Sequence, residues 1–134
     1  MKTIFKVLVP AAMLLFASCE KDEGKLPNIS FKTGGSYISS DATIAGGTTI
    51  LMGIDASKSE DRDVLKKFNI SRSVNGGAES SLQDKSLSSS EEDKFSTDFS
   101  FKLDTIKGQT NKFIYTVTNR DGLTNQVALT VTVK

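Results

Sequence analysis

The sequence predicts an all-β fold: a single antiparallel two-sheet sandwich that follows a signal peptide and a tether. The chain has 134 residues, of which 37% are hydrophobic, and this suits one domain with a modest core. Apolar residues alternate with polar ones along most of the chain, and no sustained apolar spacing at the helical period follows the first 19 residues. Clusters of turn-forming residues separate the alternating stretches.

Alternating stretches are expected to form strands that turn one face to the core and one to water. They cover residues 29–31, 48–56, 65–74, 95–103, 113–117 and 127–133. Residues 61–67 could form one helical turn, because Leu65 and Phe68 are three residues apart. The side chains that we expect to be buried between the sheets are Phe99, Phe113, Tyr115, Val117, Leu129 and Val131.

The breaks between these stretches contain residues that favour tight turns. They stand at Gly34-Gly35, Gly46-Gly47, Asn75-Gly76-Gly77 and Arg120-Asp121-Gly122. The Asp-Gly pair lies between the last two strands and predicts a hairpin there. Residues 86–93 are polar and acidic, so we expect them to form an exposed loop.

The first residues have the features of an export signal. Lys2 and Lys6 accompany an uncharged stretch, residues 7–17, that ends at Ser18 and Cys19. This apolar stretch is too short for a membrane-spanning helix, which needs about 20 residues. We therefore divide the chain into a signal peptide at 1–18, Cys19 with a flexible charged tether at 19–27, and the sandwich at 28–134.

The segment Leu15-Phe16-Ala17-Ser18-Cys19 resembles the lipobox of bacterial lipoproteins. The resemblance implies that the signal is cut before Cys19 and that the Cys19 thiol receives the lipid. Several acyl chains are enough for stable membrane anchoring. The run Glu20-Lys21-Asp22-Glu23 resembles an acidic tag that takes some lipoproteins to the outer face of the outer membrane. It implies display on the cell surface; the alternative is a soluble spacer on a protein at the periplasmic face.

A second resemblance lies inside the predicted sandwich. Two stretches, Asp55-Ala56-Ser57-Lys58-Ser59-Glu60-Asp61-Arg62-Asp63 and Tyr115 to Thr124, are similar to parts of PKD domains. PKD domains are immunoglobulin-like β-sandwiches, so the resemblance implies that fold for residues 28–134. It also implies an extracellular spacer, or a module that binds protein or carbohydrate.

The composition excludes several chemistries. The chain has no His, which excludes a Ser-His-Asp triad and His-ligated zinc, and its single Cys excludes an internal disulfide. A net charge of +1 argues against nucleic acid as a partner. No spacing of residues indicates a catalytic, cofactor or metal site. We therefore expect no catalytic residues, no cofactor and no metal, and a chain that is not an enzyme.

Two features leave alternatives open. The acidic loop from Asp55 to Asp63 offers carboxylates for calcium, but its side chains can instead hold turns; we expect Asp55 to hold the loop through backbone hydrogen bonds. Tyr37 could stack on a sugar or anchor its loop. These features predict a non-catalytic envelope lipoprotein that acts as an interaction or accessory module for a protein or a glycan. The alternative is a structural spacer with no ligand of its own.

Overall fold

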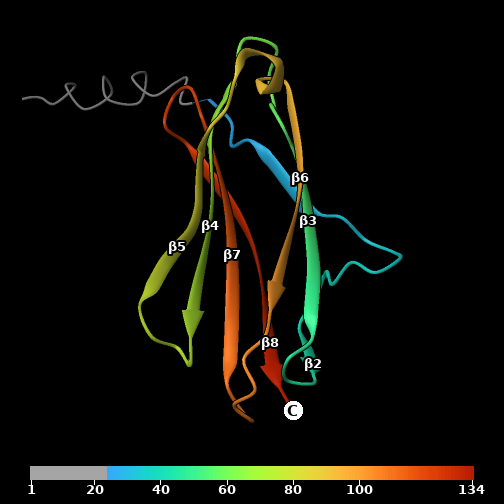
Figure 1. Ribbon diagram of the computed structural model, residues 1–134. Coiled ribbons are helices and arrows are strands. Elements are labelled where there is room, and N and C mark those ends of the chain that lie inside the picture. The colour runs from blue at the N-terminus through green and yellow to red at the C-terminus, as the bar shows by residue number, and fades with distance from the viewer. Residues whose placement is uncertain (1–23) are drawn as a thin grey trace, which may run out of the picture.

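The computed structural model describes residues 24–134, so the predicted signal peptide, Cys19 and the acidic run lie outside the described residues. Residues 24–134 form two sheets packed face to face (Figure 1). One sheet has three strands in the order β1-β3-β6, and the other has five in the order β2-β8-β7-β4-β5. The predicted all-β sandwich of two sheets is confirmed.

The elements follow one another with short connections, and strands meet mostly in antiparallel pairs. The one parallel pair among the strands of residues 24–134 joins β2 and β8. No helix in the same residues is long and apolar enough to cross a membrane. The element bounds are β1 (Asn28–Phe31), β2 (Ala42–Ile44), β3 (Thr49–Ser57), β4 (Leu65–Val74), β5 (Glu79–Ser86), the 3₁₀ helix η2 (Ser89–Glu91), β6 (Lys94–Lys102), β7 (Thr110–Asn119) and β8 (Thr124–Val133).

The core lies between the two sheets and is built from every second residue of the long strands, as the alternation predicts. Of the six side chains expected there, Phe99 alone is only partly buried, because β6 is an edge strand and leaves part of the ring open to solvent. Its neighbour Phe101 packs edge-on against the buried Phe113, with ring centroids 5.1 Å apart. The other five are buried: Phe113, Tyr115, Val117, Leu129 and Val131.

Two expectations about local structure are wrong. Residues 61–67 form no helical turn, because Leu65 already begins β4 and its side chain enters the core. The single short helix of residues 24–134 lies instead at Ser89–Glu91, inside the predicted polar loop. Strands β2 and β5 were also not predicted as strands. β5 is an edge strand with mostly exposed polar side chains, so its sequence lacks the apolar alternation that marks a half-buried strand.

Substituting Phe113 and Phe99 in turn should distinguish a fully buried position of the core from a partly exposed position at its rim. We expect Phe113→Ala to lower the free energy of unfolding by about 3–5 kcal/mol, because the ring is fully buried. Phe99→Ala should cost clearly less, since part of the ring already contacts water. Urea denaturation of both variants gives the two values. Equal losses would contradict the assignment of Phe99 to the rim.

Candidate functional site: the outer face of the three-stranded sheet

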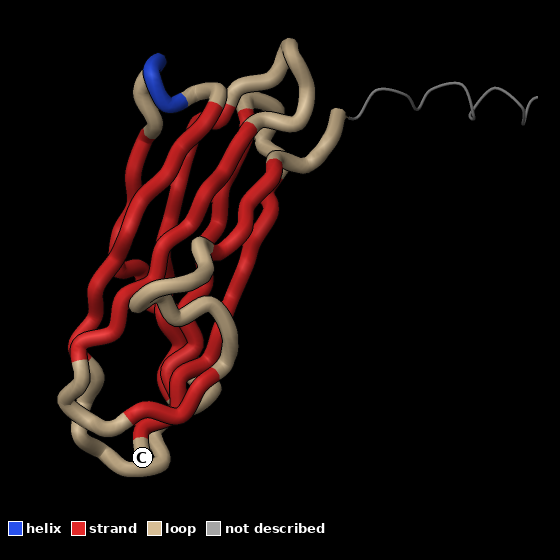
Figure 2. The backbone as a smooth tube through the Cα atoms, turned by 90° about the vertical axis from the view of Figure 1, so that its right-hand side faces the viewer, coloured by secondary structure: helices blue, strands red, loops and turns tan. Residues whose placement is uncertain are grey.

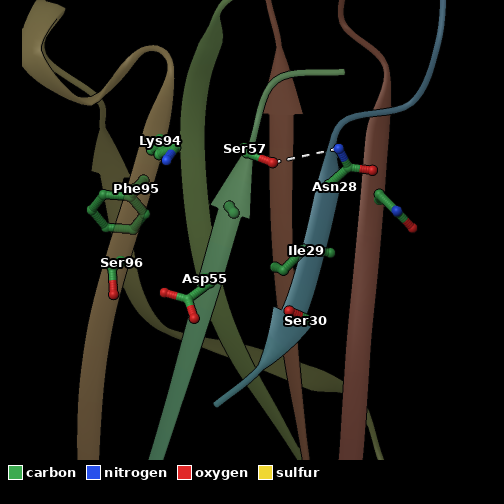
Figure 3. Close-up of a pocket in the computed structure, with 10 residues that line it drawn as sticks. Asn28, Ile29, Ser30, Asp55, Ser57, Lys94, Phe95 and Ser96 are labelled. Carbon is green, nitrogen blue, oxygen red and sulfur yellow. Dashed lines mark hydrogen bonds between the residues drawn. The ribbon is translucent and has the colours of Figure 1, made fainter.

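The outer face of the three-stranded sheet carries rows of polar side chains that cross all three strands. The register places Ser30, Asp55 and Ser96 side by side in one row, and all three are exposed. Because side chains of one parity share a face, the neighbouring row two residues along faces the same way. That row holds Asn28, Ser57 and Lys94. Figure 3 shows both rows on β1, β3 and β6.

These rows line an open hollow of about 640 Å³. Ile29, Ala56, Phe95 and Asn125 also contribute to its lining, so polar groups stand beside some apolar surface. Pockets that bind small molecules typically measure about 300–1,000 Å³. The hollow therefore has the size of a small-molecule site, although its lining is more polar than usual.

The hollow contains two opposite charges that do not pair with each other. Asp55 on β3 and Lys94 on β6 are both exposed, and neither side chain makes an ion pair or a hydrogen bond within residues 24–134. On the side of β3 away from Lys94, the amide of Asn28 donates to the Ser57 hydroxyl oxygen at 3.4 Å, as the dashed line in Figure 3 marks. The two charged groups are thus available to a bound molecule.

A third row of residues on the same face of the sheet lies beside the hollow, and two of its side chains form an ion pair. Lys32 Nζ donates to Asp98 Oδ1 at 2.8 Å, and the Tyr37 hydroxyl lies 2.9 Å from the same oxygen and 3.0 Å from Oδ2. All three side chains lie over Gly53 of β3. A Cβ at Gly53 would come within 2.6 Å of the Asp98 carboxylate and 2.8 Å of the side chains of Lys32 and Tyr37. Glycine is therefore required here so that the group can lie flat on the sheet.

The hydrogen bonds of this group shift the pKa of each member. The ammonium of Lys32 and the hydroxyl of Tyr37 hold the pKa of Asp98 below its usual value, because both donate to the carboxylate. The same bonds raise the pKa of Lys32 and of Tyr37. Lys32 and Tyr37 are therefore held in their protonated forms, which suits a fixed contact and not a nucleophile or a general base.

Tyr37 acts as the anchor of its loop. The residues between β1 and β2, coloured cyan in Figure 1, project beyond β3 on the side away from the five-stranded sheet. Tyr37 forms an isolated bridge with Leu51, and its hydroxyl is engaged by Asp98. Of the two alternatives for this residue, loop anchoring fits these contacts. An isolated glycine within an alternating strand indicates that another group approaches the backbone closely there. Gly53 is such a glycine, so the sequence indicates this contact.

The structure corrects the role expected of Asp55 in the acidic loop. Asp55 lies inside β3 and points to the hollow, whereas the loop is held by Asp63, which is 4% exposed. Asp63 accepts the Val64 backbone N–H at 2.8 Å and the Asn119 side-chain amide at 2.7 Å. Among residues 24–134, no three His, Cys, Asp or Glu side chains form a group that could hold a metal ion. Cys19, the expected lipid site, lies outside the described residues.

Comparison with known proteins shows the fold and no family. No family model matches the chain, and no curated protein matches it. Two solved structures of superoxide reductase (neelaredoxin) from Ignicoccus hospitalis are similar. The first, of a variant with one substitution, has a TM-score of 0.55 and 10% identity, and the match covers 89% of this chain and 86% of that chain. The second has a TM-score of 0.51 and 10% identity, with 82% and 81% covered.

These neighbours overturn the function that we inferred from the sequence. The predicted non-catalytic module for protein or glycan, with a spacer as its alternative, drew on a resemblance to domains that serve as modules and spacers. The two similar solved structures are superoxide reductases, and a reductase is an enzyme. The functional prediction is therefore wrong, because the sandwich does not point to a non-catalytic module. At 10% identity the likeness shows the fold and not the activity.

Removing the charge of Asp98 should release the loop that Tyr37 anchors. In Asp98→Asn, the resonances of Tyr37 and its neighbours should shift and broaden, since the charged acceptor of two hydrogen bonds is lost. In the unchanged protein the contact should be complete above about pH 4 and should weaken as pH falls below the ordinary value of 3.8, because the folded pKa of Asp98 is lowered. NMR spectra over this range test both.

Asp93→Asn is the matched control, because this exposed carboxylate directly before β6 pairs with Lys58 and makes no contact with Tyr37. The control should leave the Tyr37 resonances unchanged. An Asp98→Asn spectrum identical to that of the unchanged protein would show that the ion pair does not hold the loop.

Proposed function

We propose that this chain is a lipid-anchored protein of a bacterial envelope and that it binds a small zwitterionic molecule in the hollow on its three-stranded sheet. The observation that carries the binding proposal is the pair of unpaired opposite charges, Asp55 and Lys94, in a hollow of about 640 Å³. Asp55 receives the ammonium group of the ligand, and Lys94 receives its carboxylate. The hydroxyl groups of Ser30, Ser57 and Ser96 complete the polar contacts.

The anchoring proposal depends on Cys19. It is the only thiol of the chain, and it stands where a basic and apolar signal gives way to charged residues. Acyl chains on this residue would hold the protein on the outer membrane. The acidic residues Glu20 to Glu23 favour the cell surface, and the periplasmic face is the alternative.

Superoxide reduction is the activity that the structural neighbours suggest, and the residues of this chain do not fit it. Electron transfer to superoxide needs a redox centre, and imidazole and thiolate are typical ligands of redox iron. The chain has no His, and its one Cys is Cys19. The described residues also hold no group of three potential metal ligands. We therefore derive no redox step for this sandwich.

Replacing Cys19 tests the anchor. Cys19→Ala should abolish labelling by a radioactive fatty acid and move the protein out of the membrane fraction, because no other residue can carry the lipid as a thioether. Lys21→Ala, in the adjacent charged run, should leave the labelling unchanged and serves as the control. Lipid labelling of Cys19→Ala at the original level would refute the anchor.

A zwitterion and two molecules that each carry one of its charges test whether the hollow binds both charges. We expect 4-aminobutanoate to bind with a Kd of about 1 mM, and butylamine and butanoate, which each carry one of its charges, to bind more weakly. Asp55→Asn should weaken 4-aminobutanoate and butylamine roughly fivefold, since an exposed charge pair contributes up to about 1 kcal/mol. Lys94→Gln should weaken 4-aminobutanoate and butanoate by a similar factor. NMR titrations give each Kd.

Asp84→Asn is the control for these titrations, because Asp84 lies on β5 in the other sheet. It should leave every Kd unchanged. If 4-aminobutanoate shifts no resonance of β1, β3 or β6, or if Asp55→Asn and Lys94→Gln leave its affinity unchanged, the hollow is not a site for a zwitterion.

A further inference from the structure

The residues that lead into the sandwich are fixed to one end of it. Lys25 donates its backbone N–H to Glu60 Oε2 at 3.2 Å, and its carbonyl accepts the Asn119 side-chain amide at 3.2 Å. The carbonyl of Pro27 accepts the Asn125 side-chain amide at 2.9 Å, and the Pro27 ring is buried. Gly24–Pro27, assigned to the flexible tether from the sequence, is therefore held against the loop before β4, the end of β7 and the start of β8.

This attachment defines which end of the molecule is near residue 24. Figure 2 shows the described chain beginning at the end that carries η2, while the C-terminus lies at the opposite end. β7 has ten residues and runs between the two ends. At about 3.4 Å per residue, the ends are roughly 30 Å apart. Asn28, Ser57 and Lys94, which line the hollow, are strand-terminal residues on the same end as residue 24.

The distance from the proposed lipid to this end is short. Cys19 precedes Gly24 by five residues, and even a fully extended chain spans only about 17 Å over that length. We infer that the end of the sandwich formed by the β3–β4 loop, η2 and the β7–β8 hairpin faces the lipid headgroups, and that the C-terminal end points away. This inference rests on the proposed lipid on Cys19. It places the opening of the hollow near the membrane surface.

The charges at this end do not by themselves favour contact with anionic lipid. Glu60, Asp61 and Asp121 stand beside Arg62 and Arg120 around a second depression at this end, separate from the hollow. Because acidic and basic groups are interspersed there, no basic excess exists that would draw the end to the surface. The short connection to Cys19, and not adsorption, would then set the orientation.

Fluorescent probes at the two ends test the orientation in full-length acylated protein. We would attach the probe through Asp61→Cys at the near end and, separately, through Lys107→Cys in the β6–β7 connection at the far end. Vesicles of phosphatidylethanolamine and phosphatidylglycerol would carry a nitroxide quencher on the headgroup. We expect quenching to be several times stronger at position 61 than at position 107. Equal quenching, or stronger quenching at position 107, would overturn the orientation.

A longer connection is the matched control. Twenty Gly and Ser residues inserted between Glu23 and Gly24 add about 25 Å of flexible reach, so the difference between positions 61 and 107 should largely disappear. The experiment also distinguishes a failure of the proposed lipid anchor from a failure of the proposed orientation. Protein that lacks lipid and does not bind vesicles would overturn the anchor and the orientation with it. Protein that is acylated and bound, but equally quenched at both positions, would overturn the orientation alone.

Discussion

The arrangement of this end of the sandwich depends on one buried amide side chain, that of Asn119. The residue is 2% exposed and ends β7. Its Nδ2 donates to the Lys25 carbonyl and to Asp63 Oδ2, and its Oδ1 accepts the backbone N–H groups of Asp121 and Leu123 at 3.0 and 2.9 Å. Three segments far apart in the sequence therefore share one group: the entering chain, the β3–β4 loop and the β7–β8 hairpin. Buried amides left without such partners would be costly.

This constraint extends to the candidate site through β1. Residues 24–27 are held at one end, so β1 begins at Asn28 directly against the last residue of β3. The register then brings Asp55 beside Ser30 and leaves Lys94 across the sheet from Asn28. A chain that entered the fold freely would not fix β1, which has only four residues. Attachment at Asn119 thus links the position of the hollow to the proposed position of the membrane.

The sequence predicts the long strands because burial of one face imposes strict alternation, and it predicts the last hairpin because Asp-Gly favours that turn. It does not predict β5, whose side chains are mostly exposed, or the role of Asn119, whose partners are up to 94 residues away. Asp55 and Asp63 look equivalent in the sequence, because both lie in one acidic run. The structure places Asp55 on the exposed face of β3, whereas Asp63 lies beyond the end of that strand and is buried. The function inferred from resemblance was wrong, because one sandwich arrangement serves unrelated activities.

Hydrogen exchange in Asn119→Ala tests most directly whether one side chain holds these segments together. The backbone amides to follow are those of Lys25, Asp121 and Leu123, with the amides shared by β4 and β7 as the reference. Asn119→Ala removes the acceptor of the Asp121 and Leu123 amides and the donor to the Lys25 carbonyl, and each lost bond costs about 1–3 kcal/mol, so exchange at all three amides should speed up by about tenfold or more while the reference stays slow. If Lys25 keeps its slow exchange while Asp121 and Leu123 lose theirs, the entering chain is held independently of Asn119, and the account is contradicted.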